Sequence, residues 1–168
     1  MSNPALFFAI AGISMSFAGF AGLFLALRPR DAKWEMYEVG QVNTIVLYAL
    51  LTMFSALFVV PLASLIGEFT ALQVMSAVVL ALAFYAHQIK LGTSWVTWYQ
   101  VRRGLSRRDL AMEVAPFAVA AIAEQVLLLA NLVAPSQELY ELALITMLVT
   151  PALVFVIVVI RLGSTAGR

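Results

Sequence analysis

Few side chains in this sequence could do chemistry, and the most informative one is a glutamate in an otherwise apolar stretch. Glu124, followed by Gln125, lies about ten residues from either end of the run from 114 to 134. An ionisable side chain at the middle of a membrane span is costly and usually faces a partner or a water-filled cavity. Burial also disfavours the charged form of a carboxyl unless a cation or several donors face it. Glu124 therefore predicts either a proton or cation relay or a neutral carboxyl that joins neighbouring helices.

Helical periodicity places further polar side chains near Glu124. Glu113 and Asn131 precede and follow it by 11 and 7 residues. At 3.6 residues per turn, these spacings bring the three side chains within about 20° of one helix face. Ala120 and Ala121 border this face, so a neighbouring helix or a file of water could come close to it.

The single histidine, His87, lies beside Gln88 and Lys90 near the end of another apolar run. On a helix it would lie roughly 8–9 Å from the depth of Glu124. That distance excludes a direct hydrogen bond but allows contact through one or two waters. His87 is therefore either part of a His–Glu relay or a histidine near the membrane surface with an ordinary partner. One histidine and no cysteine argue against a catalytic metal or bis-histidine haem site, so we expect no metal and no cofactor.

Hydroxyl groups in three other apolar runs fall at about the depth of Glu124. They are Ser14, Ser16, Thr52, Ser55 and Thr150. Pro151 cannot donate a hydrogen bond to the carbonyl of Met147, which frees an acceptor there. Transporters and channels bind ions or protons in polar layers of this kind. The candidate pathway residues are Glu124, Gln125, His87, Glu113, Asn131 and Thr150.

The elements that must position these residues are membrane-spanning helices. Of the 168 residues, 63% are hydrophobic and 11% are charged, whereas soluble domains have roughly 25% charged residues. Five apolar runs are long enough to cross a bilayer as helices. They cover residues 5–27, 43–66, 71–91, 114–134 and 139–160, approximately. The sequence thus predicts an all-α integral membrane protein, a five-helix bundle in a single transmembrane domain over residues 1–168.

The positive charges lie on one side of this bundle. All ten lysines and arginines fall between the first and second runs, at or after the end of the third, or after the fifth. The positive-inside rule then places the N-terminus outside and the C-terminus in the cytoplasm. We expect a multi-pass protein of the inner (cytoplasmic) membrane.

The first apolar run carries small residues at a spacing of four. They are Ser14, Ala18, Gly22 and Ala26. Small residues at this spacing let helix backbones approach closely in lipid. This helix-packing face predicts either packing inside the bundle or a contact in a homo-oligomer or along a pore.

Aromatic and basic residues mark the two loops on the charged side. Trp34, Trp95, Trp98 and Tyr99 are expected to be interfacial anchors at headgroup level. Four arginines follow the last three of these aromatics. They are Arg102, Arg103, Arg107 and Arg108. These arginines either enforce the topology or bind anionic lipids.

The predicted architecture resembles that of the tryptophan-rich sensory (translocator) proteins in helix number, N-terminal orientation and length. In that family Trp-Arg-Pro-Pro-like loops join the helices. Here the first loop reads Arg28-Pro29-Arg30-Asp31-Ala32-Lys33-Trp34, and only three tryptophans occur in all. The resemblance is architectural and assigns no site residue.

Motifs and available chain length limit the function classes. The sequence has no phosphate-binding glycine loop, nucleophile elbow or H-E-x-x-H motif, and its loops leave no room for a soluble catalytic domain. We expect no enzyme and no nucleic-acid partner. The first hypothesis is an oligomeric channel or small transporter for protons or cations, with its pathway between protomers. The alternatives are a structural subunit of a larger membrane complex and, less favoured, a small-ligand-binding membrane protein.

Overall fold

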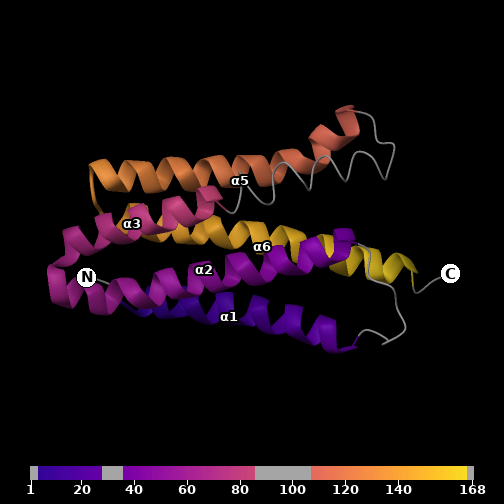
Figure 1. Cartoon of the computed structure of the whole chain (residues 1–168), viewed down its shortest axis with the longest axis horizontal. Helices are drawn as coiled ribbons and strands as arrows, with labels where there is room; N and C mark the ends of the chain where they lie inside the picture. The colour runs from indigo at the N-terminus through magenta and orange to yellow at the C-terminus, as the bar shows by residue number, and fades with distance from the viewer. Residues whose placement is uncertain (1–3, 28–35, 86–106, 166–168) are drawn as a thin grey trace.

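The computed structural model describes residues 4–27, 36–85 and 107–165, and over these residues the protein is entirely α-helical (Figure 1). The helices are α1 (Pro4–Leu27), α2 (Met36–Ile66), α3 (Glu68–Phe84), α5 (Arg107–Val133) and α6 (Gln137–Thr165). The predicted all-α class is therefore confirmed. Helices α1, α2, α5 and α6 are long and apolar enough to cross a membrane. Helix α3 is apolar but has 17 residues in the described part of the chain.

Helices α2 and α5 begin well before the hydrophobic runs predicted. Helix α2 begins at Met36 rather than near residue 43, and α5 begins at Arg107 rather than near residue 114. Apolar composition marks the part of a helix that can lie in lipid, whereas backbone hydrogen bonds can continue into polar flanks. The apolar parts of these helices, Gly40–Ile66 and Ala115–Val133, lie close to the predicted runs.

The helices lie side by side along the long axis of the molecule (Figure 1). Helix α1 packs on α2, α2 packs on α6, and α6 packs on α5, while α3 contacts both α2 and α5. The described ends of the chain lie at opposite ends of the bundle. Helices α2 and α6 therefore form the centre of the bundle, and their facing sides can position a buried site.

Two tight turns join helices at the end of the bundle where α1 begins. Gly67 has a φ of 87° and connects α2 to α3, a backbone conformation that favours glycine. Asn131 and Ser136 shape the turn between α5 and α6. The Asn131 side-chain oxygen accepts a hydrogen bond from the Ser136 N–H at 2.7 Å. The Ser136 hydroxyl oxygen accepts one from the Leu139 N–H at 3.1 Å and so caps α6.

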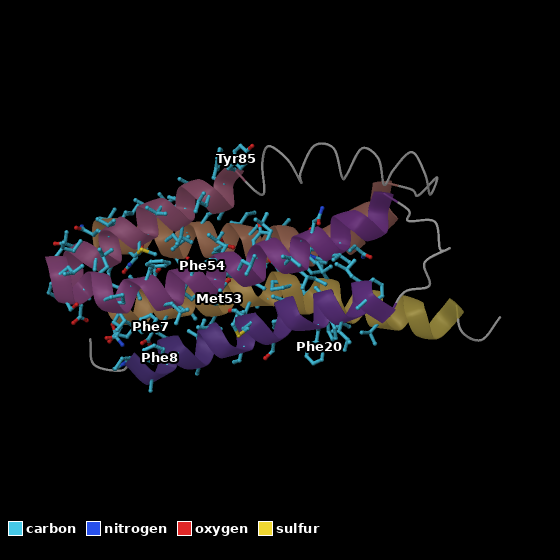
Figure 2. The ribbon with its side chains drawn as sticks, turned by 60° about the horizontal axis from the view of Figure 1, so that its bottom comes forward. Phe7, Phe8, Phe20, Met53, Phe54 and Tyr85 are labelled. Atoms are coloured by element: carbon cyan, nitrogen blue, oxygen red, sulfur yellow. The ribbon has the colours of Figure 1, made fainter. Side chains whose placement is uncertain are left out.

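Large apolar side chains cover the outside of the bundle. Phe8 and Phe20 project from the outer side of α1 (Figure 2), with 55% and 50% of their surface exposed. Exposed large apolar residues also occur on each of the other helices, for example Phe58, Phe69, Ile122 and Ile145. Such a surface is stable in contact with lipid and not with water. The protein is a multi-pass membrane protein in contact with a bilayer.

The apolar interior is divided into two clusters. The first, here called the turn-side core, lies toward the Gly67 end. Its members include Phe7, Ile10, Met53, Val59, Leu72, Leu128, Tyr140 and Met147. The second, here called the loop-side core, lies toward the opposite end of the bundle. Its buried members are Ala21, Val42, Ile45 and Val154, with Phe17, Phe117 and Phe155 packed against them. The ring of Phe155 contacts those of Phe17 and Phe20, with centroids 6.2 and 5.5 Å apart.

Candidate functional site

Glu124 is completely buried inside the bundle. Its side chain is 0% exposed, and neither carboxyl oxygen has a hydrogen-bond partner among the described residues. Buried polar groups in proteins are nearly always hydrogen-bonded, because an unpartnered group costs about 1–3 kcal/mol. An exception of this kind, on the only acidic side chain in the apolar part of α5, marks a candidate functional group.

Thr150 in α6 is the second buried group without a partner. Its hydroxyl lies in the interior, where the residue is 4% exposed, and makes no hydrogen bond within the described chain. The other buried hydroxyls near this depth behave differently. Ser14, Thr52 and Ser55 donate to carbonyls of their own helices at 2.6–2.8 Å. Thr150 therefore keeps both its proton and its lone pairs for another partner.

The register of the helices places Glu124 and Thr150 at similar depths. Glu124 lies ten residues before Ala134, and Met147 lies ten residues after Gln137, on the two sides of the α5–α6 turn. Glu124 and Met147 are therefore level in this antiparallel pair. Thr150 follows Met147 by three residues, so it lies about 4.5 Å farther from the α5–α6 turn at 1.5 Å per residue.

Tyr48 brings α2 to the same depth. The Tyr140 hydroxyl donates to the carbonyl of Ser55 at 3.2 Å, which fixes the register of α6 against α2. Met147 lies seven residues after Tyr140 on α6, and Tyr48 lies seven residues before Ser55 on α2. Because the two helices are antiparallel, Met147 and Tyr48 lie at similar depths. Tyr48 is 1% exposed and lies close enough to Glu124 to interact with it electrostatically. Three helices thus contribute Tyr48, Glu124 and Thr150 to one layer.

This polar layer lies between the two apolar cores. Along α2, Tyr48 falls between Ile45 of the loop-side core and Met53 of the turn-side core. Along α6, Thr150 falls in the same way between Met147 and Val154. The layer therefore lies between packed apolar side chains on both sides along the bundle axis.

Asn131 has a structural role that the sequence did not indicate. It is 0% exposed, and its amide nitrogen donates to the Ser76 hydroxyl of α3 at 2.8 Å. One turn along α3, Gln73 donates to the carbonyl of Leu132 at 3.0 Å. Asn131 shares a helix face with Glu124, but its polar groups are already paired. Gln125 lies beside Glu124 and is half-buried.

Several sequence-predicted residues lie outside the part of the chain that can be placed at this site. His87, Trp34, Trp95, Trp98, Tyr99, Arg102 and Arg103 are outside the described residues. Glu113, Arg107 and Arg108 belong to the described backbone of α5, but their side chains do not. The His–Glu relay, the interfacial anchors and the lipid-binding arginines therefore remain predictions.

The small residues of the helix-packing face on α1 differ in exposure. Ser14 is buried and Ala18 is half-buried, whereas Gly22 and Ala26 are exposed. A side-chain carbon added at Gly22 would meet no atom within 4 Å. The helix-packing face, inside the bundle or in a homo-oligomer, therefore stays a prediction.

Comparisons with known proteins add no assignment to this geometry. No protein-family model, curated protein or solved structure matches the chain. The architectural resemblance to the translocator proteins therefore contributes no residue to the site.

Tyr48 is the site residue that sequence reasoning missed. Tyr48, Thr52 and Ser55 recur at a spacing of four and three residues, which places them on one face of α2. The polar positions Thr52 and Ser55 were sufficient to define that face, and extending it by one turn identifies Tyr48. The buried oxygen atoms without a partner at this site come from α5 and α6. No cluster of three or more metal-ligating His, Cys, Asp or Glu side chains occurs among the described residues.

Proposed function

We propose that this protein is a channel or small transporter for protons or cations, and that Glu124 is the group that binds and releases the transported charge. The complete burial of a carboxyl with no hydrogen-bond partner carries this proposal. A carboxyl with only a structural role would be expected to hold a donor or acceptor on a neighbouring helix, as Asn131 does. Glu124 is positioned to exchange a proton or a cation instead.

The pathway in this proposal runs through the interior of one chain. Sequence analysis favoured a pathway between protomers, but the Glu124 side chain faces the α2–α6 centre and not the lipid-facing surface. Transport requires the site to open alternately or continuously toward the two sides. Because packed apolar side chains close the polar layer at both ends, this arrangement fits a transporter in an occluded state.

The proposal includes five membrane spans, an outside N-terminus and a cytoplasmic C-terminus in the inner membrane. Helix α3 follows α2 directly in the chain and is apolar over its described length. A fifth span that includes α3 would put every lysine and arginine on one side.

Flux into liposomes tests the proposed function. Purified protein reconstituted into vesicles should give a pH-gradient- or cation-gradient-dependent flux that Glu124→Gln abolishes. Glu138→Gln is a matched control, because Glu138 is an exposed glutamate near the start of α6 and should be dispensable. If the wild-type protein carries no flux under any gradient, or if Glu124→Gln leaves the flux unchanged, the proposal is wrong.

A second candidate is an accessory subunit of a membrane assembly, and the outer face of α1 favours it. Small exposed residues recur there, and the spacing between them alternates between four and three residues. They are Ala5, Ala9, Gly12, Ser16 and Gly19. Side-chain carbons added at Gly12 and Gly19 would meet no atom within 4 Å, so the stripe is open to a helix of another chain.

Co-purification from the native membrane tests this candidate. A subunit should co-purify with stoichiometric partners or with further copies of itself, and Gly12→Leu with Gly19→Leu should abolish that association without unfolding the bundle. Phe20→Leu, a change at an exposed position on the same helix, should not. Purification as a monomer from a mild detergent, with or without the glycine changes, would argue against this role.

A further inference from the structure

The oxygen atoms around Glu124 indicate what the site binds. We propose that Glu124, Thr150 and the backbone carbonyl of Met147 form a binding site for one dehydrated alkali cation, such as Na⁺ or K⁺. The inference rests on the proposed role of Glu124 as the exchanging group and specifies the chemical class that it exchanges.

The ligands come from two adjacent helices that pack along their length. Glu124 supplies two carboxyl oxygens from α5 and Thr150 supplies a hydroxyl oxygen from α6, and all three atoms are buried without partners. These are the only buried side-chain oxygen or nitrogen atoms without a partner in the described residues. The three oxygen atoms lie in one layer and are not scattered through the bundle, as the ligands of a single ion must be.

Pro151 adds a backbone ligand at the same depth. Proline has no N–H, so within α6 the Met147 carbonyl cannot receive the hydrogen bond that position 151 would otherwise donate. Met147 is level with Glu124 and is 0% exposed. Discontinuities in transmembrane helices expose carbonyls that coordinate cations in this way.

Charge and ligand type select the class of ion. Hard cations such as the alkali and alkaline-earth ions prefer oxygen ligands. A single carboxylate balances one positive charge, and a divalent ion would retain an uncompensated charge in a low-dielectric interior. No side chain among the described residues, including Tyr48 and Thr150, donates a hydrogen bond to the carboxyl oxygens of Glu124. A monovalent metal cation meets these conditions.

Thermal unfolding in defined salts tests the site directly. The full chain in detergent or nanodiscs is unfolded in lithium, sodium or potassium chloride, with N-methyl-D-glucamine chloride holding the ionic strength constant. One alkali ion should raise the melting temperature by about 4 °C or more as its concentration increases from about 1 to about 300 mM. Glu124→Gln should abolish this shift.

Changes at Thr150 separate a coordinating role from a packing role. Thr150→Val removes the oxygen at nearly constant shape and should weaken the apparent cation affinity by about tenfold, whereas Thr150→Ser should retain it. Thr146→Val is the matched control one turn away, because the Thr146 hydroxyl already donates to the carbonyl of Leu142 at 2.8 Å. That change should leave cation affinity unaltered.

The outcomes distinguish this inference from the proposed function. The inference is overturned if no alkali ion shifts the melting temperature, or if the shift persists in Glu124→Gln. It is also overturned if liposomes free of alkali ions show a Glu124-dependent proton flux that Thr150→Val does not change, a result that leaves the proposed function intact. Glu124-dependent cation binding without flux under any gradient would support the inference and overturn the transport function.

Discussion

Asn131 donates a hydrogen bond to the Ser76 hydroxyl at 2.8 Å, whereas Glu124, two turns away on the same helix, has no partner for either carboxyl oxygen. Both side chains are fully buried. Asn131 joins α3 to the α5–α6 turn, because its oxygen also accepts from the Ser136 N–H. The two most prominent polar side chains of α5 therefore differ in role, and their substitution should have opposite effects on stability.

Asn131→Ala should lower the stability of the protein. The change removes the bonds to Ser76 and Ser136 and leaves the Ser136 N–H without its acceptor. The expected loss in the free energy of unfolding is about 2 kcal/mol. Thermal or denaturant unfolding in a mild detergent measures it. Ser76→Ala should cost less, and the double variant should cost less than the sum, because both changes remove the same bond. A strictly additive double variant would contradict the pairing.

Glu124→Leu should raise stability while abolishing the proposed transport. Leucine removes a buried carboxyl that has no partner and fits an apolar environment, so the free energy of unfolding should increase by about 1–3 kcal/mol. Functional sites commonly have this conflict between stability and activity. Unfolding in N-methyl-D-glucamine salts, without alkali ions, measures the change. A loss of stability as large as that of Asn131→Ala would instead make Glu124 a structural residue.

Gly67→Ala should destabilise the turn between α2 and α3. The φ of 87° at this position places a side-chain carbon close to the backbone, at a cost of about 1–2 kcal/mol. Gly19→Ala is the matched control, because an added carbon meets no atom within 4 Å at either position, and only Gly67 has a positive φ. That change should leave stability unchanged or raise it by up to about 1 kcal/mol. Equal effects of the two substitutions on the melting temperature would be inconsistent with the turn geometry.

Labelling of single cysteines should establish the orientation of α6 in the membrane. The chain has no native cysteine, so each introduced thiol is the only target. In intact cells, a membrane-impermeant maleimide should label Glu138→Cys, near the α5–α6 turn, and should not label Ser164→Cys unless the membrane is opened. The reverse pattern would place the C-terminus outside. Labelling of both positions in sealed cells would rule out an odd number of crossings between the two sites.

Hydrophobicity determined the outline of this fold. Long apolar runs cannot be buried within a chain of this length, so lipid must be the solvent, and the helices at α1, α2, α5 and α6 follow from that requirement. The boundaries near residues 43 and 114 were less accurate. Hydropathy reports where a helix meets lipid and does not report where its backbone hydrogen bonds begin.

The sequence by itself also singled out Glu124 and Thr150, because a carboxyl or a proline-flanked hydroxyl in an apolar run is unusual whatever its neighbours are. Only the tertiary structure decided that Asn131 is paired while Glu124 and Thr150 are not, and that Tyr48 lies with them between two apolar cores. Helical periodicity fixes the face on which a side chain lies. Its partner depends on the rotation and register of other helices, which are set by packing between segments far apart in the chain.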